Sequence, residues 1–253
     1  MKLPERATWN GILHIWSGGG WYIGTARDTK PHAHHALQIA LSIDGQFLFR
    51  GDLVKEWILC DVVIIAPNIR HQTDAEGRTM ALYYLDADSK QARQISETLD
   101  LKRIQVLEKP VELELLQQFW QKGETVERMA EGFDAVLKAL CKDLKKNLLS
   151  LDSRVETAIE RIRSRPSEIV SVEGLASEVG LSVSRFSHLF REQTGLSVQR
   201  YRLWMKLRRG LELLSSNYSL TEVAHESGFS DSSHFTRTFR QMFGIAPSEL
   251  GKD

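Results

Sequence analysis

The sequence predicts an α+β multidomain protein, with an N-terminal β-barrel, a helical appendage and a C-terminal all-α region that holds two helix-turn-helix units. Three observations predict this fold class. Short apolar or alternating runs fill the chain as far as Asp86, apolar residues at helical spacing follow, and one motif near the C-terminus occurs twice. The 253 residues, 42% hydrophobic and 26% charged, are enough for two ordinary domains. We expect domains at 1–88, 89–150 and 151–253.

The β-region extends from Trp9 to Asp86. Turn residues separate its apolar or alternating runs, which are TWNGILHIW, GWYIGTARD, LQIALSI, QFLFR, EWILCDVVIIA and TMALYYLD. Asp44-Gly45 stands between the third and fourth runs, and glycine accepts the positive φ of a tight turn at no steric cost. We therefore expect a hairpin at this position.

The helical appendage begins after Asp86 with a polar, helical stretch that Lys109-Pro110 ends. Between Val111 and Leu151, apolar residues recur at spacings of three and four, which predicts two helices separated by Lys122-Gly123. Such a stripe can cap the barrel core or pair with a second subunit. We favour a homodimer, because the stripe is longer than one small barrel needs. A linker is expected at Lys145–Asp152.

Helical periods resume in the C-terminal region. We expect Ser153 to cap its first helix, which Arg165-Pro166 ends, and Ser171 to cap the next. A long helix is expected from about Val198 to Leu214, and at 1.5 Å per residue it is about 25 Å long.

The repeated motif reads LSVSRFSHLFREQTG at 181–195 and FSDSSHFTRTFRQMFG at 229–244. A short helix ending in glycine precedes each copy, Ala176–Gly180 and Ala224–Gly228, which is typical of a helix-turn-helix. The copies align at an offset of 48 in their leading halves and 49 beyond, so the second contains one inserted residue. Core-facing positions recur at spacings of three and four: Phe186, Leu189 and Phe190, then Phe235, Phe239 and Met242 or Phe243.

Basic residues gather around the first copy although the formal net charge of the chain is zero. Between Ser182 and Gly210, Glu192 is the one acidic residue among seven basic ones, namely Arg185, Arg191, Arg200, Arg202, Lys206, Arg208 and Arg209. Such clustering is typical of a double-stranded-DNA-binding face. An ordinary solvated helix with extended arginines is the alternative.

The stretch GFSDSSHFTRTFRQMFGIAP resembles the signature of the AraC/XylS family of transcription regulators, and the resemblance covers residues 153–250. It implies that each reading helix enters a major groove. The family's base-contacting positions fall on Ser184, Ser187, His188, Ser232, Ser233, His234 and Arg237, and backbone contacts are expected from Arg185, Arg191 and Arg240. Arg237 is the best base reader of this set, because a guanidinium can bond guanine O6 and N7 together. Leu250 and Gly251 depart from the Tyr-Arg usual in the family.

A histidine pattern lies in the β-region. His32, His34 and Gln38 share one parity, and the run from His32 to Gly45 resembles the first motif of the cupin barrels, while Pro67–His71 resembles part of the second. In metal cupins the matching residues, here His32, His34, Gln38 and His71, hold an iron, manganese or zinc ion. Glutamine replaces the usual glutamate, so we expect contacts to a small-molecule effector more than a metal site. Effector contacts are expected from His32, His34, Gln38, His71 and Trp9.

These patterns predict a cytoplasmic transcription regulator, with double-stranded DNA, an effector and a second copy as partners and RNA polymerase as a further candidate. The sequence has no apolar run long enough to span a membrane, and we expect no resident cofactor and no enzyme activity. A metal-dependent cupin enzyme fused to a DNA-binding module is the rival hypothesis, and a regulator without a ligand is the third. Cys60 and Cys141 are expected to be buried thiols, with redox sensing as the alternative.

Overall fold

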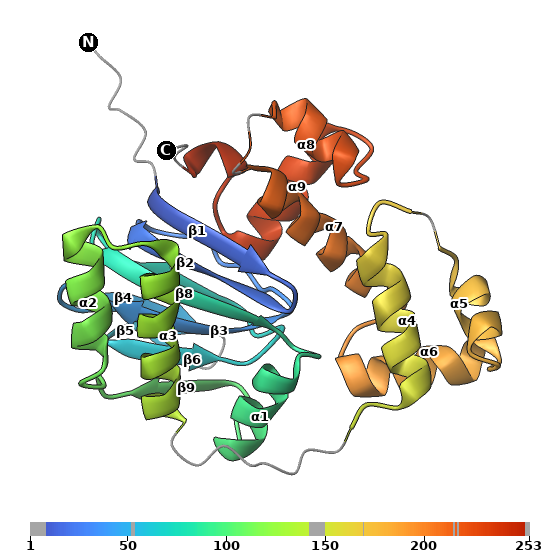
Figure 1. The fold of residues 1–253 in the computed structure, drawn as a ribbon, viewed down its shortest axis with the longest axis horizontal. Coiled ribbons are helices and arrows are strands. Elements are labelled where there is room, and N and C mark those ends of the chain that lie inside the picture. The colour runs from blue at the N-terminus through green and yellow to red at the C-terminus, as the bar shows by residue number, and fades with distance from the viewer. Residues whose placement is uncertain are drawn as a thin grey trace. The chain divides into compact units, whose positions relative to one another are not determined.

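The computed structural model describes residues 9–51, 54–141, 150–168, 170–214, 216 and 218–250. The chain divides into two compact units (Figure 1). The first unit comprises 1–147 together with 240–253, and the second comprises 148–239. An all-β region followed by helices is the predicted fold class, and it is confirmed.

The described strands of the first unit form two antiparallel sheets. The larger sheet has the order β1-β2-β8-β3-β6-β9, and the smaller has the order β5-β4-β7. Their bounds are β1 Asn10–Trp16, β2 Gly19–Thr25, β3 Ala36–Ser42, β4 Phe47–Gly51, β5 Val54–Cys60, β6 Val62–Ile65, β7 His71–Asp74, β8 Thr79–Asp86 and β9 Ile104–Leu107.

Strand pairing differs from the sequence prediction at three places. Gly45 makes the expected turn with φ +87°, but no hairpin forms, because β3 pairs with β6 and β8 while β4 pairs with β5 and β7. The run EWILCDVVIIA divides at Asp61 into strands of different sheets. The segment Ile104–Leu107, expected to be helical, is strand β9 because it pairs with β6 at the sheet edge.

Helices α1 (Lys90–Thr98), α2 (Leu113–Lys122) and α3 (Val126–Leu140) share a core with the larger sheet. In Figure 1, α2 and α3 lie beside one another against this sheet. Alternate strand residues such as Trp21, Leu37, Ile39 and Tyr83 join this core, and the ring of Phe133 stacks on Trp21 at 5.0 Å between centroids.

The apolar stripe expected to form a homodimer therefore packs on the sheet of its own chain, and the region 89–141 belongs to the same compact unit as the barrel. The alternative interpretation of the stripe, a cap over the barrel core, accounts for its buried residues. The expected linker lies outside the described residues from Lys145 to Leu149.

The second unit is helical, with α4 Ser153–Ser164, α5 Val172–Glu178, α6 Val183–Thr194, α7 Val198–Leu214, α8 Leu220–Glu226 and α9 Ser232–Phe243. The last residues of α9 belong to the first unit. Helix α7 has the predicted bounds, and in Figure 1 it runs between α8 at one end and α4 and α6 at the other. The expected cap at Ser153 is wrong by one residue: Asp152 accepts from the Arg154 N–H, and Ser153 is already helical.

Candidate functional site

The two helix-turn-helix motifs, α5–α6 and α8–α9, share a serine cap at the first helix and a glycine in the turn. The Ser171 hydroxyl accepts from the Gly174 N–H at 3.0 Å, and the Ser219 hydroxyl accepts from the Glu222 N–H at 3.3 Å. Side-chain acceptors of this kind satisfy donors left open at a helix start. Gly180 and Gly228 turn the chain with positive φ values of +67° and +81°. Four residues separate α5 from α6 and five separate α8 from α9, which places the inserted residue in the second turn.

Each longer helix buries phenylalanines on one face and exposes polar residues on another. In α6, Phe186 and Phe190 are buried, and in α9 their counterparts Phe235 and Phe239 are buried. Leu189, Met242 and Phe243, also expected in the core, are only partly buried. The exposed faces have matching residues at an offset of 49, at spacings of four and seven: Ser184, His188 and Arg191 in α6, and Ser233, Arg237 and Arg240 in α9.

The other predicted base readers are less free to reach outward. Ser187, Ser232 and His234 are half-buried. The His234 ring lies edge-on to Phe229 at 5.1 Å, and its Nδ1 is 3.2 Å from the Ser230 hydroxyl. Half-buried Thr236, absent from the predicted set, is the counterpart of Ser187. The offset of 49 alone could have identified it.

The basic cluster around the first copy is only partly a surface. Lys206 Nζ donates to the Gly228 carbonyl at 2.6 Å, which ties α7 to the second turn. Arg202 donates to the Glu168 carbonyl, Arg209 pairs with Glu212, and Arg208 is buried. Exposed positive charge is left at Arg185, Arg191 and Arg200. The exposed basic surface is therefore narrower than the charge pattern predicted.

Three histidines meet in the first unit. The expected continuous strand is absent, because β3 begins only at Ala36, and His32 instead forms an isolated bridge to His71. His32, His34 and His71 nevertheless come together, with potential ligand nitrogens all within 4.8 Å of one another and each side chain at most 5% exposed. His35 is buried too but lies outside this group.

Hydrogen bonds fix how these rings are protonated. Nδ1 of His32, His34 and His71 lies 2.9, 3.0 and 2.9 Å from the carbonyls of Lys30, Ala36 and Ile69. A carbonyl only accepts, so each Nδ1 must carry the proton and donate it. Burial lowers the pKa of all three rings, that of His32 to about 3, so the rings are neutral. In a neutral ring the lone pair then lies on Nε2.

The environment of these lone pairs differs. Nε2 of His71 has no hydrogen-bond partner among the described residues, and an unsatisfied buried group of this kind costs about 1–3 kcal/mol. Nε2 of His34 is 2.8 Å from the Gln38 side-chain amide. Since His34 donates through Nδ1, the amide must offer an N–H to that lone pair. The three imidazole rings suit a metal ion in atom type, whereas Gln38 is engaged with His34 and carries no charge where cupins have a carboxylate.

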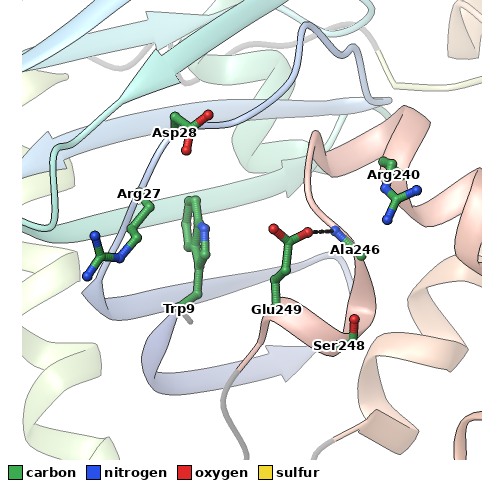
Figure 2. Close-up of a pocket in the computed structure, with 7 residues that line it drawn as sticks. All are labelled: Trp9, Arg27, Asp28, Arg240, Ala246, Ser248 and Glu249. Carbon is green, nitrogen blue, oxygen red and sulfur yellow. Dashed lines mark hydrogen bonds between the residues drawn. The ribbon is translucent and has the colours of Figure 1, made fainter. Parts of the chain in front are cut away.

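Trp9, the remaining predicted effector contact, lines a separate pocket of about 310 Å³ (Figure 2). Figure 2 shows Glu249 of the C-terminal segment between Trp9 and Ala246, with Arg240 near Ala246 and Arg27 on the other side of Trp9. The whole lining is Trp9, Arg27, Asp28, Arg240, Ala246, Ser248 and Glu249. Backbone bonds from Trp9 N to the Glu249 carbonyl at 2.7 Å and from Lys30 N to the Gly244 carbonyl at 2.8 Å hold this segment in place.

Both motifs lie in a region that is similar to known proteins. The family described as "Helix-turn-helix domain" matches residues 175–253. The chain is 30% identical over 155 residues to the HTH-type transcriptional activator RhaS of Salmonella typhimurium, covering 55% of this chain and 56% of that protein. Residues 175–253 therefore form a helix-turn-helix domain. The RhaS of Escherichia fergusonii is 35% identical over 118 residues, covering 44% and 42%. This chain thus spans about half the length of the curated relatives that it matches.

Solved structures share the fold over most of this chain. ToxT from Vibrio cholerae gives a TM-score of 0.60 at 12% identity, covering 92% of this chain and 97% of that one. A second ToxT structure from Vibrio cholerae, with unsaturated fatty acid bound, also gives 0.60 at 12% identity, covering 94% and 96%. These similarities concern the fold alone.

The cysteines are as expected. Cys60 and Cys141 are buried, and burial raises their pKa to about 12 and about 11. Thiols with such pKa values are poor nucleophiles at neutral pH, which disfavours redox sensing. Among the described helices, none combines the length and apolarity needed to cross a membrane.

Proposed function

We propose that this chain is a sequence-specific DNA-binding transcription regulator whose affinity for DNA is set by a small organic effector bound in its first unit. The observation that carries the proposal is the repeated exposed row, Ser184, His188 and Arg191 in α6 and Ser233, Arg237 and Arg240 in α9. A solvated helix face needs no such repetition. Two copies of one row joined by a rigid helix suit two segments of a major groove.

Each side chain in the rows has a role set by its length and charge. Arg237 is exposed and long enough to bond guanine O6 and N7 together. Ser184, Ser233 and His188 are shorter and suit contacts to phosphate or to bases through water. Arg185, Arg191 and Arg240 supply charge for phosphates. The second motif therefore reads more sequence than the first.

The pocket at Trp9 is the effector site in this proposal. An indole wall suits an apolar group, and the guanidinium group of Arg27 suits an anion. The negative charge of Glu249 opposes an anion less than it would if free, because its carboxylate already accepts from the Ala246 N–H. The fatty acid named for a ToxT structure is a ligand of this chemical type. Such an effector shifts DNA affinity by no more than its differential affinity for the two states.

The remaining expectations belong to the same proposal. The curated relatives are transcriptional activators, which supports a regulator over a metal-dependent cupin enzyme. A homodimer in the cytoplasm, with RNA polymerase as a further partner, is the setting in which such a regulator acts.

DNA binding is tested with the full chain and a library of random duplexes. Selection is expected to enrich one sequence, and its Kd measured by fluorescence anisotropy is expected to rise steeply with salt, as released counterions require. Equal affinity for the enriched and the starting sequences, or no binding, would contradict the proposal.

The effector site is tested separately with sodium decanoate and with neutral decanol. We expect decanoate alone to raise the melting temperature and to change the Kd for the selected DNA, and Arg27→Ala to remove both effects. Arg128→Ala, which removes an exposed charge on α3, is the matched control. Equal responses in wild type and Arg27→Ala would place the effector elsewhere.

A further inference from the structure

We infer that Val183, the first residue of α6, reads one thymine through its 5-methyl group and so gives the first motif a base preference of its own. The inference rests on the proposed function, because it requires α6 to enter a major groove. Val183 is not among the predicted base-contacting or backbone-contacting residues. Its exposure, its place at the start of the helix, the small size of its neighbours and its apolar chemistry all support this role.

Val183 is an apolar side chain that the fold leaves in solvent. It is 41% exposed, whereas Phe186 and Phe190 of the same helix are fully buried. The packing of α6 therefore does not bury Val183, and its side chain is available to a partner. The other large hydrophobic side chains that are exposed in the described part of the chain all lie outside α6 and α9: Trp57, Leu59, Val106, Val111, Leu115 and Tyr218.

Val183 lies at the end of α6 that leads into a groove. The Ser182 hydroxyl accepts from the Arg185 N–H at 3.4 Å, so Ser182 is the cap and Val183 is the first helical residue. The Cα–Cβ bonds of a helix tilt toward its start, so the side chain of Val183 leans toward the leading end. In helix-turn-helix complexes the first residues of the reading helix contact base edges. Val183 is therefore positioned to meet a base.

The neighbours of Val183 are small enough for a short side chain to reach that base. Ser184 follows it directly, and Ser187 lies one turn further along the same side of the helix. Long side chains at these two positions would hold the helix away from the base edges, whereas serines allow a close approach. Valine also keeps one dominant rotamer in a helix, so Val183 loses little side-chain entropy when it makes a contact.

The chemistry of valine restricts what it can recognise. Its side chain neither donates nor accepts a hydrogen bond, so it forms no bond with phosphate or with the polar edges of guanine, cytosine or adenine. The apolar group that bases display in the major groove is the 5-methyl of thymine. Contact between this methyl and the valine removes apolar surface from water on both sides. Thymine is therefore the base that Val183 favours.

The second motif has a polar residue at the equivalent position. At the offset of 49, Ser232 takes the place of Val183, and Ser232 is half-buried. The main reader of the second motif is instead Arg237, whose guanidinium suits guanine. The two segments of the binding site should therefore differ in sequence, with a thymine facing the start of α6 and a guanine facing α9.

The test compares duplexes that differ by a single methyl group. Each thymine of the duplex selected by the full chain is replaced in turn by deoxyuridine, which lacks the 5-methyl, and the Kd is measured by fluorescence anisotropy. We expect one position at which this replacement raises the Kd about fourfold, the effect of losing one buried methyl group. The same replacement should leave the Kd of Val183→Ala unchanged, because the shorter side chain no longer reaches the methyl.

Val111→Ala is the matched control, because it shortens a valine of the first unit that is 76% exposed. Its Kd and its response to deoxyuridine should equal those of wild type. Val183→Ala should keep the melting temperature of wild type, since the side chain that it removes is exposed and alanine is a good helix former. A fold defect therefore does not obscure the comparison.

Methylated cytosine gives an independent measurement at the same position. Exchange of the T·A pair for C·G should weaken binding. 5-Methylcytosine, which returns a methyl to the same place in the groove, should restore part of the affinity in wild type but not in Val183→Ala. Selective binding without such a thymine, or an equal effect of deoxyuridine on wild type and Val183→Ala, would overturn the inference and leave the proposed function intact. Absence of selective DNA binding would overturn both.

Discussion

Histidines of the two units lie in opposite environments. In the first unit, His32, His34 and His71 are buried, hydrogen-bonded and neutral. In the second, His188 is exposed, and its side chain lies 4.0 Å from Glu192. A buried polar group is part of the fold, whereas an exposed one is available to a partner. Changes in the first unit should therefore act on stability and ligands, and changes on the exposed rows should act on DNA binding.

The largest expected effect is a loss of stability when the buried core behind an exposed row is disrupted. Phe235 is fully buried, and its ring lies so close to Gly210 that a Cβ there would come within 2.4 Å. Phe235→Ala should lower the free energy of unfolding by about 3–5 kcal/mol, measured by urea denaturation, and abolish reading by the second motif. Phe235→Leu, the milder control, should cost about 1.5 kcal/mol or less. Equal stability of both variants would contradict the packing described.

Acid should destabilise the first unit. Burial holds the folded pKa of His32 at about 3, and those of His34 and His71 below their usual value. Below about pH 6.5 these histidines bind protons in the unfolded chain but remain neutral in the folded chain. The free energy of unfolding therefore falls as the pH drops. His32 alone contributes up to about 1.4 kcal/mol per pH unit once the pH is below its unfolded pKa, and His34 and His71 act in the same direction. Urea denaturation at pH 7, 6 and 5 measures the loss.

The control for this pH dependence is His225→Ala, because an exposed histidine should leave the slope unchanged. His71→Phe should reduce the slope by about one histidine's share. A free energy of unfolding that stays constant from pH 7 to pH 5 would contradict the neutral, buried cluster.

Substitutions on the exposed rows should change the affinity for DNA and leave the stability of the fold unchanged. Arg237→Ala should weaken binding to the selected duplex by about 10–100-fold, equivalent to 1–3 kcal/mol, and relax the base preference at one position. Its melting temperature should stay that of wild type. The counterpart His188→Ala should cost less, because imidazole makes no bidentate contact. A larger loss for His188→Ala than for Arg237→Ala, by fluorescence anisotropy, would reverse the assignment of the main reader.

The smallest expected effect is the difference in stability lost when the serine cap of each motif is removed. Ser219 accepts from Glu222 N–H, and the Glu222 carboxylate accepts from Ser219 N–H at 2.7 Å, a reciprocal pair at the start of α8. Ser219→Ala should cost about 1 kcal/mol. Ser171→Ala, which removes a single cap bond at α5, should cost less in the same denaturation experiment. Equal costs would show that the reciprocal bond adds nothing.

Local signals explain which elements the sequence predicted well. Helix α7 has its predicted bounds because its periodicity and neighbouring turns are encoded within it. Strand β9 was mistaken for helix because its structure depends on pairing with β6, some forty residues earlier. The hairpin at Asp44-Gly45 failed for the same reason: the turn is local, but partner choice is not.

The candidate sites divide in the same way. The shared parity of His32, His34 and Gln38 predicted that these side chains lie together. In the structure an isolated bridge to His71, and not a continuous strand, positions His32. Exposure of Ser184, His188 and Arg237 follows from helical spacing alone. Arg27 and Asp28 were not foreseen, because their pocket exists only where the C-terminal segment meets the loop after β2. Likewise, only the fold shows that Lys206 and Arg202 serve the scaffold.

The central claim, that the two exposed rows read two segments of one duplex, is tested most directly by hydroxyl-radical footprinting on the selected DNA. We expect two protected segments about 10–10.5 base pairs apart, with Arg237→Ala weakening one and His188→Ala weakening the other. A single protected segment, or loss of both segments in each variant with the fold intact, would contradict the account.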